Sequence, residues 1–473
     1  MYFKKNLTLW RPISLTLLIA VLGGCATLGP DYQRPDTVST PEYSENSRWK
    51  AAVPAEALPK GAWWEMYRDN TLNELQLQAR NANQEIQGAL ARLEQARAAA
   101  RIAGSDQWPR LDFDPSARRS RSSDALSPSG NGTMGTVINV PFDMSYEIDL
   151  WGKVRRSAEA ATALYQASAA DVENLFLSVH AEVARNYFVL RGLDAEVELL
   201  ERTTALREQN LQLVESRYRN GQSARLDVAR AETELASARA EVEAVRRQRA
   251  QIEHSLAVLT GNVASSSRLA GQASLPAAPV IAAGLPSELL ERRPDVAAAE
   301  RRLMAANARI GVAKAAFFPS IRLTGSAGYS SDELNGLFDW GNRVWALGPS
   351  VTLPIFNAGR NSANLEQTEA AYTEAVANYR QSVLVAFRDV EDALSNRAFL
   401  DRQHAAQQEA LRAAQEAATL SAHRYQAGQI SYLEVIDSER TALAHERAVT
   451  QIRAQQLQAS VALVKALGGG WEK

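Results

Sequence analysis

Few residues of this 473-residue sequence could take part in chemistry. The five histidines are scattered along helical patterns, and the letters HERAV that begin at His445 lack the second histidine of a zinc-protease helix. No phosphate-cradling glycine loop and no nucleophile elbow accompanies them, so each histidine is interpreted as a surface or packing residue. We therefore predict that the protein is not an enzyme and that it holds no catalytic metal and no cofactor.

The single cysteine, Cys25, carries the most specific chemical prediction. It follows a positively charged stretch and an apolar run over 13–22, and the letters LGGC place small residues just before it. The run is too short to span a bilayer and is organised as a targeting segment. The pattern resembles a bacterial lipoprotein signal, so we expect removal of residues 1–24 and attachment of lipid, palmitate included, to Cys25. An ordinary secretory signal is the weaker alternative.

Two similar sixteen-residue segments lie 207 positions apart: RYRNGQSARLDVARAE from Arg217 and RYQAGQISYLEVIDSE from Arg424. In each copy a helical pattern ends at a glycine, Gly221 or Gly428, and a second helical pattern follows. Glycine suits a helix end because the left-handed backbone there costs it nothing. Each segment is therefore the predicted tip of a helical hairpin.

Long helices must position these tips. All 17 prolines lie outside residues 142–275 and 355–473, and proline is excluded from helix interiors. Apolar residues recur in both tracts at the spacing of helices packed as coiled coils, so we predict a single helix from Lys153 to Arg219. The sequence is a duplication in which each half reads helix, strand, strand and long helical hairpin.

Residues 138–150, which precede the first long helix, alternate between apolar and polar side chains. This period predicts a strand with one apolar face. We predict strands over about 109–121, 136–149, 319–330 and 345–356. A small sheet packed on a core is the alternative, but no second layer is available in the sequence to cover the apolar face. Four strands are too few to close a barrel, and three chains would supply about twelve.

The predicted organisation follows the duplication. A lipid-anchored extended segment over 25–60 precedes the first repeat over 61–262, whose tip spans about 217–227. A linker over 263–285 leads to the second repeat over 286–473, whose tip spans about 424–437. The net charge of −2 shows no basic excess, so no nucleic-acid partner is expected. No later segment has the roughly 18 consecutive apolar residues of a membrane-spanning helix.

Several long segments resemble the TolC-type outer-membrane factors, specifically the lipoprotein branch that serves tripartite efflux pumps. They are GPDYQRP, WWEMYRDNTLNELQLQA, YEIDLWGKVRR, LPSELLERRPDVAAAERRLMAANARIGVAKAAFFPSIRLTG, LPIFNAGRNSANL and LVKALGGGW. The resemblance implies a mainly α-helical homotrimer with a 12-stranded outer-membrane β-barrel and a coiled-coil α-barrel in the periplasm. It implies a passive exit duct for drugs or other toxic compounds, with a periplasmic adaptor and an inner-membrane transporter of the RND type as partners.

The resemblance also implies that the tips close the periplasmic end of the duct. The corresponding gate residues are Tyr425, Leu433, Glu434, Asp437, Tyr218 and Asp227, and the tip residues exposed to the adaptor are Arg217, Gly221, Arg424 and Gly428. Three-fold symmetry would bring three copies of Asp437 toward one axis. The alternative is that Glu434 and Asp437 are solvated acids that complement a helix dipole. Some relatives place a linking arginine where this chain has Ile430, which leaves Arg225 as the substitute.

Two other functions compete with a drug-efflux duct. The duct could serve a heavy-metal efflux or secretion system, because a wide tube need not bind its cargo. A periplasmic adaptor lipoprotein would also carry a lipid and a coiled-coil hairpin. It would have one hairpin followed by β-rich domains, whereas this chain has two hairpins and ends in a helical pattern.

Overall fold

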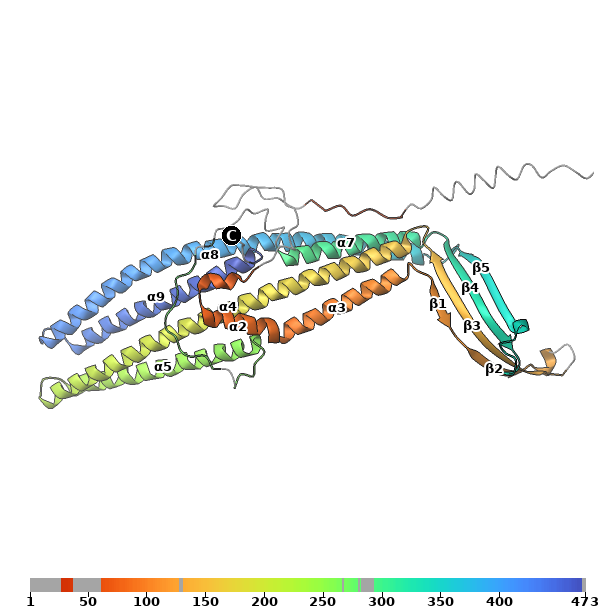
Figure 1. The fold of residues 1–473 in the computed structure, drawn as a ribbon. Coiled ribbons are helices and arrows are strands. Elements are labelled where there is room, and N and C mark those ends of the chain that lie inside the picture. The colour runs from red at the N-terminus through yellow and green to blue at the C-terminus, as the bar shows by residue number, and fades with distance from the viewer. Residues whose placement is uncertain are drawn as a thin grey trace, which may run out of the picture. The chain divides into compact units, whose positions relative to one another are not determined.

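The computed structural model describes residues 27–36, 61–126, 131–265, 268–279, 281 and 293–469. Cys25 and the predicted signal segment lie outside these residues. The chain forms two compact units (Figure 1). The sheet unit combines Arg92–Ala169 and Ala298–Arg380 with the segment 27–36. The hairpin unit combines the described parts of Ala170–Ala297 and Gln381–Lys473 with residues 61–91.

Four long helices supply most of the hairpin unit: α4 (Lys153–Arg219), α5 (Arg225–Leu259), α8 (Arg360–Gln426) and α9 (Tyr432–Ala466). Helices α4 and α8 each have 67 residues, and α5 and α9 each have 35. The duplication therefore repeats the helix lengths to the residue. The predicted helix from Lys153 to Arg219 is confirmed. Within the described residues, no helix is both long and apolar enough to cross a membrane.

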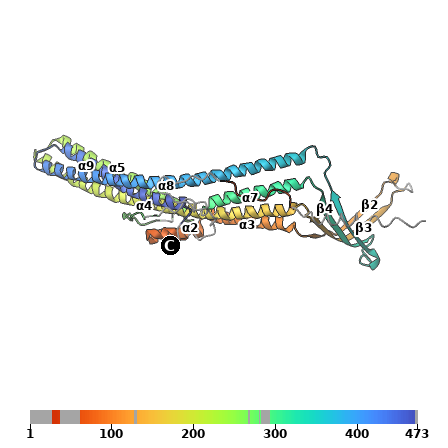
Figure 2. The same ribbon diagram turned by 90° about the horizontal axis from the view of Figure 1, so that it is seen from above.

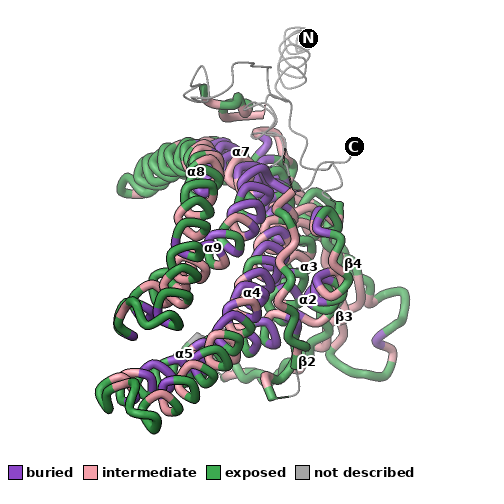
Figure 3. The backbone as a smooth tube through the Cα atoms, turned by 90° about the vertical axis from the view of Figure 1, so that its left-hand side faces the viewer, coloured by how far each residue is buried: buried purple, intermediate pink, exposed green. Residues whose placement is uncertain are grey.

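The core of the hairpin unit lies where α4 meets the short N-terminal elements and the ends of α5 and α9. The N-terminal elements are η1 (Trp63–Tyr67) and α2 (Asn70–Ala82), which α3 (Gln84–Ser105) follows. The core is built from fully buried side chains, among them Leu72, Tyr187, Phe188, Leu256 and Leu457. Figure 3 shows such buried positions along the facing sides of the long helices. Full burial of one such side chain contributes about 1.5–3 kcal/mol.

The sheet unit contains five antiparallel strands: β1 (Arg110–Phe113), β2 (Ser116–Arg121), β3 (Met134–Ile148), β4 (Ser320–Ser331) and β5 (Arg343–Thr352). Their order is β1-β3-β4-β5, with β2 also paired to β3. Helices α3 and α7 (Pro294–Ala315) precede the strands of the first and second repeat, and η2 (Asp124–Leu126) and η3 (Trp340–Asn342) lie between strands. Figure 2 shows the sheet beyond the ends of α3 and α7.

Two strands differ from the sequence prediction. The strand expected over 109–121 is divided at Asp114 and Pro115, although β1 and β2 keep one register on β3. The interruption lies opposite Pro141, so two prolines that lack an N–H remove hydrogen bonds from this part of the ladder. The last strand, expected over 345–356, starts earlier, at Arg343, and ends at Thr352 before Pro354.

The pairing sorts the side chains onto two faces, because directly opposed residues of an antiparallel pair share a face. Phe142 is opposite Phe113 and Ala327, and Ala327 is opposite Trp345. This apolar face is open to solvent in the single chain, with Phe142 52% and Trp345 79% exposed. In the described chain the sheet ends in β1 and β2 on one side and in β5 on the other, and neither edge has a further strand beside it.

The segment 27–36 is held against the helices of the sheet unit. Arg34 donates two hydrogen bonds to the Glu300 carboxylate, at 2.7 and 2.8 Å, and Arg156 forms an ion pair with Asp31 at 2.7 Å. The backbone N–H of Leu28 donates to the Trp151 carbonyl at 3.0 Å. The chain that follows Cys25 is thus tied down near the junction between β3 and α4.

Candidate functional site

Each hairpin tip is a Schellman-type helix end built around a glycine. Gly221 has φ 72° and Gly428 has φ 75°. In the first tip Gln222 N–H donates to the Arg217 carbonyl at 2.8 Å, and in the second Gln429 N–H donates to the Arg424 carbonyl at 2.9 Å. No atom lies within 4 Å of a Cβ added at either glycine, so backbone conformation alone selects glycine here.

The acidic residues predicted at the tips lie at the starts of the returning helices. Glu434 forms a capping box with Ser431 at the N-terminus of α9. Asp227, in the first turn of α5, accepts a hydrogen bond from the Ser223 hydroxyl at 3.1 Å. Asp437 lies one turn into α9 and is exposed. Glu434 thus has a helix-capping contact, and Asp227 has side-chain contacts at the start of its helix. The described residues give the Asp437 carboxylate no side-chain hydrogen bond or ion pair.

The two tyrosines of the second tip pack between the hairpins. Tyr425 and Tyr432 are buried with Val214 and Val228 in one apolar cluster, and their rings lie 5.4 Å apart. The Tyr425 hydroxyl has no hydrogen-bond partner among the described residues. Burial raises the pKa of the Tyr432 hydroxyl above its ordinary value. The corresponding residue of the first tip, Tyr218, is exposed.

The arginine of the first tip links it to the second. Arg217 donates from Nη1 to the Tyr425 carbonyl and from Nη2 to the Gln426 carbonyl, both at 3.0 Å. Its guanidinium also lies over the Tyr425 ring, 4.6 Å from the centroid. These carbonyls belong to the last turn of α8, where backbone acceptors lack intrahelical partners. Arg217 therefore caps the helix of the other hairpin.

A buried ion cluster links the hairpins farther from the tips. The Glu234 carboxylate of α5 is only 6% exposed and accepts hydrogen bonds from Arg440 of α9. Arg207 of α4 reaches the same carboxylate, with Nη2 3.3 Å from Oε2. Two arginines from different hairpins thus share one buried carboxylate.

Two further contacts cross the same interface. Asn210 of α4 donates to Glu439 of α9 at 3.0 Å, and burial raises the pKa of the Glu439 carboxyl above its usual range. Arg447 of α9 forms ion pairs with Glu196 at 2.6 Å and Glu241 at 3.1 Å. None of these links between hairpins was predicted from the sequence, because the charges are spaced as ordinary solvated helix faces.

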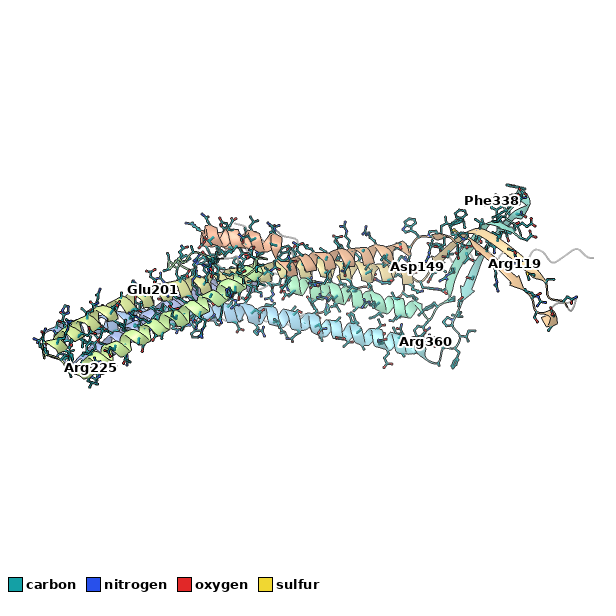
Figure 4. The ribbon with its side chains drawn as sticks, turned by 90° about the horizontal axis from the view of Figure 1, so that it is seen from below. Arg119, Asp149, Glu201, Arg225, Phe338 and Arg360 are labelled. Atoms are coloured by element: carbon teal, nitrogen blue, oxygen red, sulfur yellow. The ribbon has the colours of Figure 1, made fainter. Side chains whose placement is uncertain are left out.

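Among the described residues, the remaining tip side chains form no hydrogen bond or ion pair between the hairpins. Arg225, considered as a substitute latch, forms an ion pair with Glu232 of its own helix at 3.1 Å. Figure 4 marks Arg225 at the tip of its hairpin. The arginine contact between the two tips is made by Arg217 instead. Ile430 packs against the apolar cluster of the tips. Arg424 and Leu433 are exposed. In the described part of the chain, no group of three or more metal-ligating side chains occurs.

Comparison with known proteins identifies the molecule that carries these hairpins. Residues 75–262 and 285–469 match the family described as outer membrane efflux protein. The two matched ranges correspond to the two repeats. This chain belongs to the outer membrane efflux protein family. The TolC-type resemblance noted in the sequence is thereby confirmed, and the protein is an outer-membrane efflux duct.

Individual efflux proteins are similar to this chain over nearly its whole length. The solvent efflux pump outer membrane protein SrpC of Pseudomonas putida is 35% identical over 458 residues, which cover 96% of this chain and 97% of the relative. The outer membrane protein OprJ of Pseudomonas aeruginosa is 36% identical over 466 residues, with 97% and 95% covered. The solved structure of the outer-membrane channel OprN has a TM-score of 0.85 and 30% identity, covering 94% of this chain and all of that one.

Proposed function

We propose that this efflux protein works as a homotrimer whose sheets join into one closed wall around a pore. The observation that carries the proposal is the incomplete sheet: in the described part of the chain it exposes an apolar face and has an unpaired edge on each side. Exposed strand edges pair readily with other strands, and a contiguous exposed apolar patch marks a surface that contacts protein or membrane. Pairing β5 of one copy with β1 and β2 of the next satisfies both edges, and lipid covers the face.

The polar face of the same strands then lines the pore. It carries Asp143, Ser145, Thr324, Ser326 and Ser350. The register places these residues on the other side of the sheet from Phe142 and Trp345. A pore of this kind conducts passively and needs no bound cargo. Because the similar proteins are named as solvent, toluene and antibiotic efflux components, we propose drugs, solvents and related toxic compounds as cargo.

The hairpin tips are the proposed periplasmic entrance. We propose that they dock a periplasmic adaptor and an inner-membrane transporter of the RND type, and that docking opens a gate formed near the tips. Exposed Asp437 and Leu433 are the proposed lining of the narrowest point. Tyr425 and Arg217 act beside them by holding the two hairpins of one chain together. Acylated Cys25 is the proposed anchor in the outer membrane.

Membrane extraction tests this proposal. We expect the Cys25→Ser variant, which has no acylated residue, to remain in outer-membrane fractions and to require detergent, and the purified protein to show three-fold symmetry. A variant that is released freely into the periplasm, or particles of another symmetry, would refute the pooled sheet. In planar bilayers, Asp437→Ala is expected to change cation selectivity, and unchanged conductance and selectivity would remove that residue from the gate.

A further inference from the structure

The apolar face of the sheet carries three positive charges. Arg119 and Arg121 of β2 are opposite Thr136 and Met134 of β3, and Arg343 of β5 is opposite Tyr329 of β4. The register therefore places all three arginines on the face of Phe142 and Trp345. The other charged residues of the strands belong to the polar face: Arg110, Asp112, Arg118, Asp143, Glu147 and Arg322. Within the described strands, the apolar face thus has cations and no carboxylate.

These arginines lie at one end of the sheet. About 9–11 residues of tilted strand cross the apolar core of a membrane. Counted from Leu111 at the helix-proximal end, Arg119 and Arg121 are the ninth and eleventh residues of their strand line, at the far boundary of the apolar band. Figure 4 shows Arg119 and Phe338 at the end of the strands away from Asp149 and Arg360. The helix-proximal rows of the apolar face carry Leu111, Ile148, Ile321 and Val351 and no charge.

Two of the three guanidinium groups have no acidic partner among the described residues. Arg119 Nη2 lies 3.3 Å from the sulfur of Met134. Arg343 donates from Nε to the Trp340 carbonyl at 2.7 Å and lies over the Trp340 ring. Neither forms an ion pair with any described carboxylate, including the loop acids Asp332, Glu333 and Asp339. Arg121 pairs with Asp124 at 2.8 Å, but both side chains are more than half exposed.

We propose that Arg119, Arg121 and Arg343 bind phosphate groups of lipid headgroups at the outer surface of the membrane. This inference rests on the proposed membrane-spanning sheet. A planar guanidinium matches a phosphate with two parallel hydrogen bonds, and at the edge of an apolar band a lipid headgroup is the phosphate within reach. The exposed rings of Phe338 and Trp340 lie at the same end, where aromatic side chains favour the membrane interface. The three arginines lie at one end of the apolar band and the helix-proximal end has none, so headgroup binding would occur at only one of the two membrane surfaces.

Two matched triple variants test the assignment. Arg119→Gln, Arg121→Gln and Arg343→Gln together remove three charges from the apolar face. Arg110→Gln, Arg118→Gln and Arg322→Gln remove three from the polar face of the same strands. The assembled full-length proteins, purified in neutral detergent, are titrated by calorimetry with diphosphorylated lipid A and with the same lipid after removal of both phosphates.

We expect the wild type and the polar-face variant to bind the phosphorylated lipid about tenfold or more tightly than the dephosphorylated one, as one charge-assisted hydrogen bond would give. The apolar-face variant should bind both lipids equally weakly. Equal loss in both variants, or no preference in the wild type, overturns the proposal. Inorganic phosphate that binds as tightly as the lipid overturns the lipid as occupant.

Two controls keep the result interpretable. If the triple variant does not assemble, Arg119→Gln alone replaces it, because among the described residues the hydrogen bond of this side chain goes to a thioether and to no charged group. Failure of the wild type to insert into neutral phosphatidylcholine vesicles contradicts the membrane-spanning sheet itself. Normal insertion without phosphate preference contradicts only the arginine site.

Discussion

Replacing Arg217 by alanine is expected to favour the open state of the duct. Arg217 makes two hydrogen bonds of 3.0 Å to the end of α8 and covers the Tyr425 ring, and all of these contacts join one hairpin to the other. If the tips of the two hairpins separate when the tube opens, the wild type loses every one of these contacts, whereas the variant has none of them to lose.

The size of the effect follows from the contacts. A hydrogen bond from a charged donor contributes about 1.5–3 kcal/mol, and a cation over an aromatic ring about 0.5–1 kcal/mol at an exposed site. Arg217 is half-buried at the rim of the tip, so water replaces part of these contacts when they break. We therefore take a net loss of about 2 kcal/mol, which shifts the closed-to-open equilibrium about 30-fold.

Single-channel recording in planar bilayers measures this equilibrium as the open probability. Arg219→Ala is the matched control. Arg219 lies two residues farther along and is exposed, and among the described residues it donates only to the Glu215 carbonyl of its own helix, at 3.4 Å. The reasoning is refuted if Arg217→Ala leaves the open probability unchanged, or if Arg219→Ala raises it as much.

Three further predictions concern the hairpin unit. Glu234→Gln should lower the free energy of unfolding by about 3 kcal/mol, because Arg207 stays buried without a counter-charge. Arg440→Ala should lower it by about 1 kcal/mol, because that side chain is 59% exposed. Equal losses in denaturant melts would contradict the burial argument. Gly428→Ala should cost about 1–2 kcal/mol from the left-handed backbone alone, and a melting temperature equal to that of the wild type would exclude that strain. Burial lowers the pKa of His180 to about 4, so between pH 6.5 and 4 the unfolded chain takes up a proton that the folded chain does not, and stability should fall by about 3 kcal/mol as the pH drops. His180→Gln should flatten that part of the stability profile, and an unchanged slope would assign it to other groups.

The long helices and their tips could be predicted because their signals are local. The proline-free tract over 142–275 allowed a helix as long as α4, and a glycine followed by a helical pattern located both turns. The alternation of residues 138–150 likewise indicated β3 and its apolar face. The interruption between β1 and β2 was missed, because it depends on Pro141 of the facing strand as well as on Pro115.

The contacts between hairpins could not be predicted, because they depend on how two distant segments align. Arg217 and Tyr425 are 208 positions apart and Glu234 and Arg440 are 206 apart. On its own helix each of these arginines looks like a solvated surface residue. Only the packed hairpins show that the Glu234 carboxylate is buried and that the Arg217 guanidinium reaches the end of another helix.

The duplication does not reproduce these links, and this has a consequence for a three-fold assembly. A shift of 207 positions places Thr441 where the first repeat has Glu234, and Thr233 where the second has Arg440. The interface between the two hairpins of one chain therefore contains a buried ion cluster. The interface between hairpins of neighbouring chains lacks the equivalent residues and cannot form the same cluster. Separating charged groups from a buried carboxylate costs free energy, so an interface without such a cluster separates at a lower free-energy cost. We therefore expect the hairpins of one chain to stay joined at the Glu234 cluster when the tube opens. Separation within a chain is then confined to the tips, where Arg217 lies, and all other separation occurs between chains.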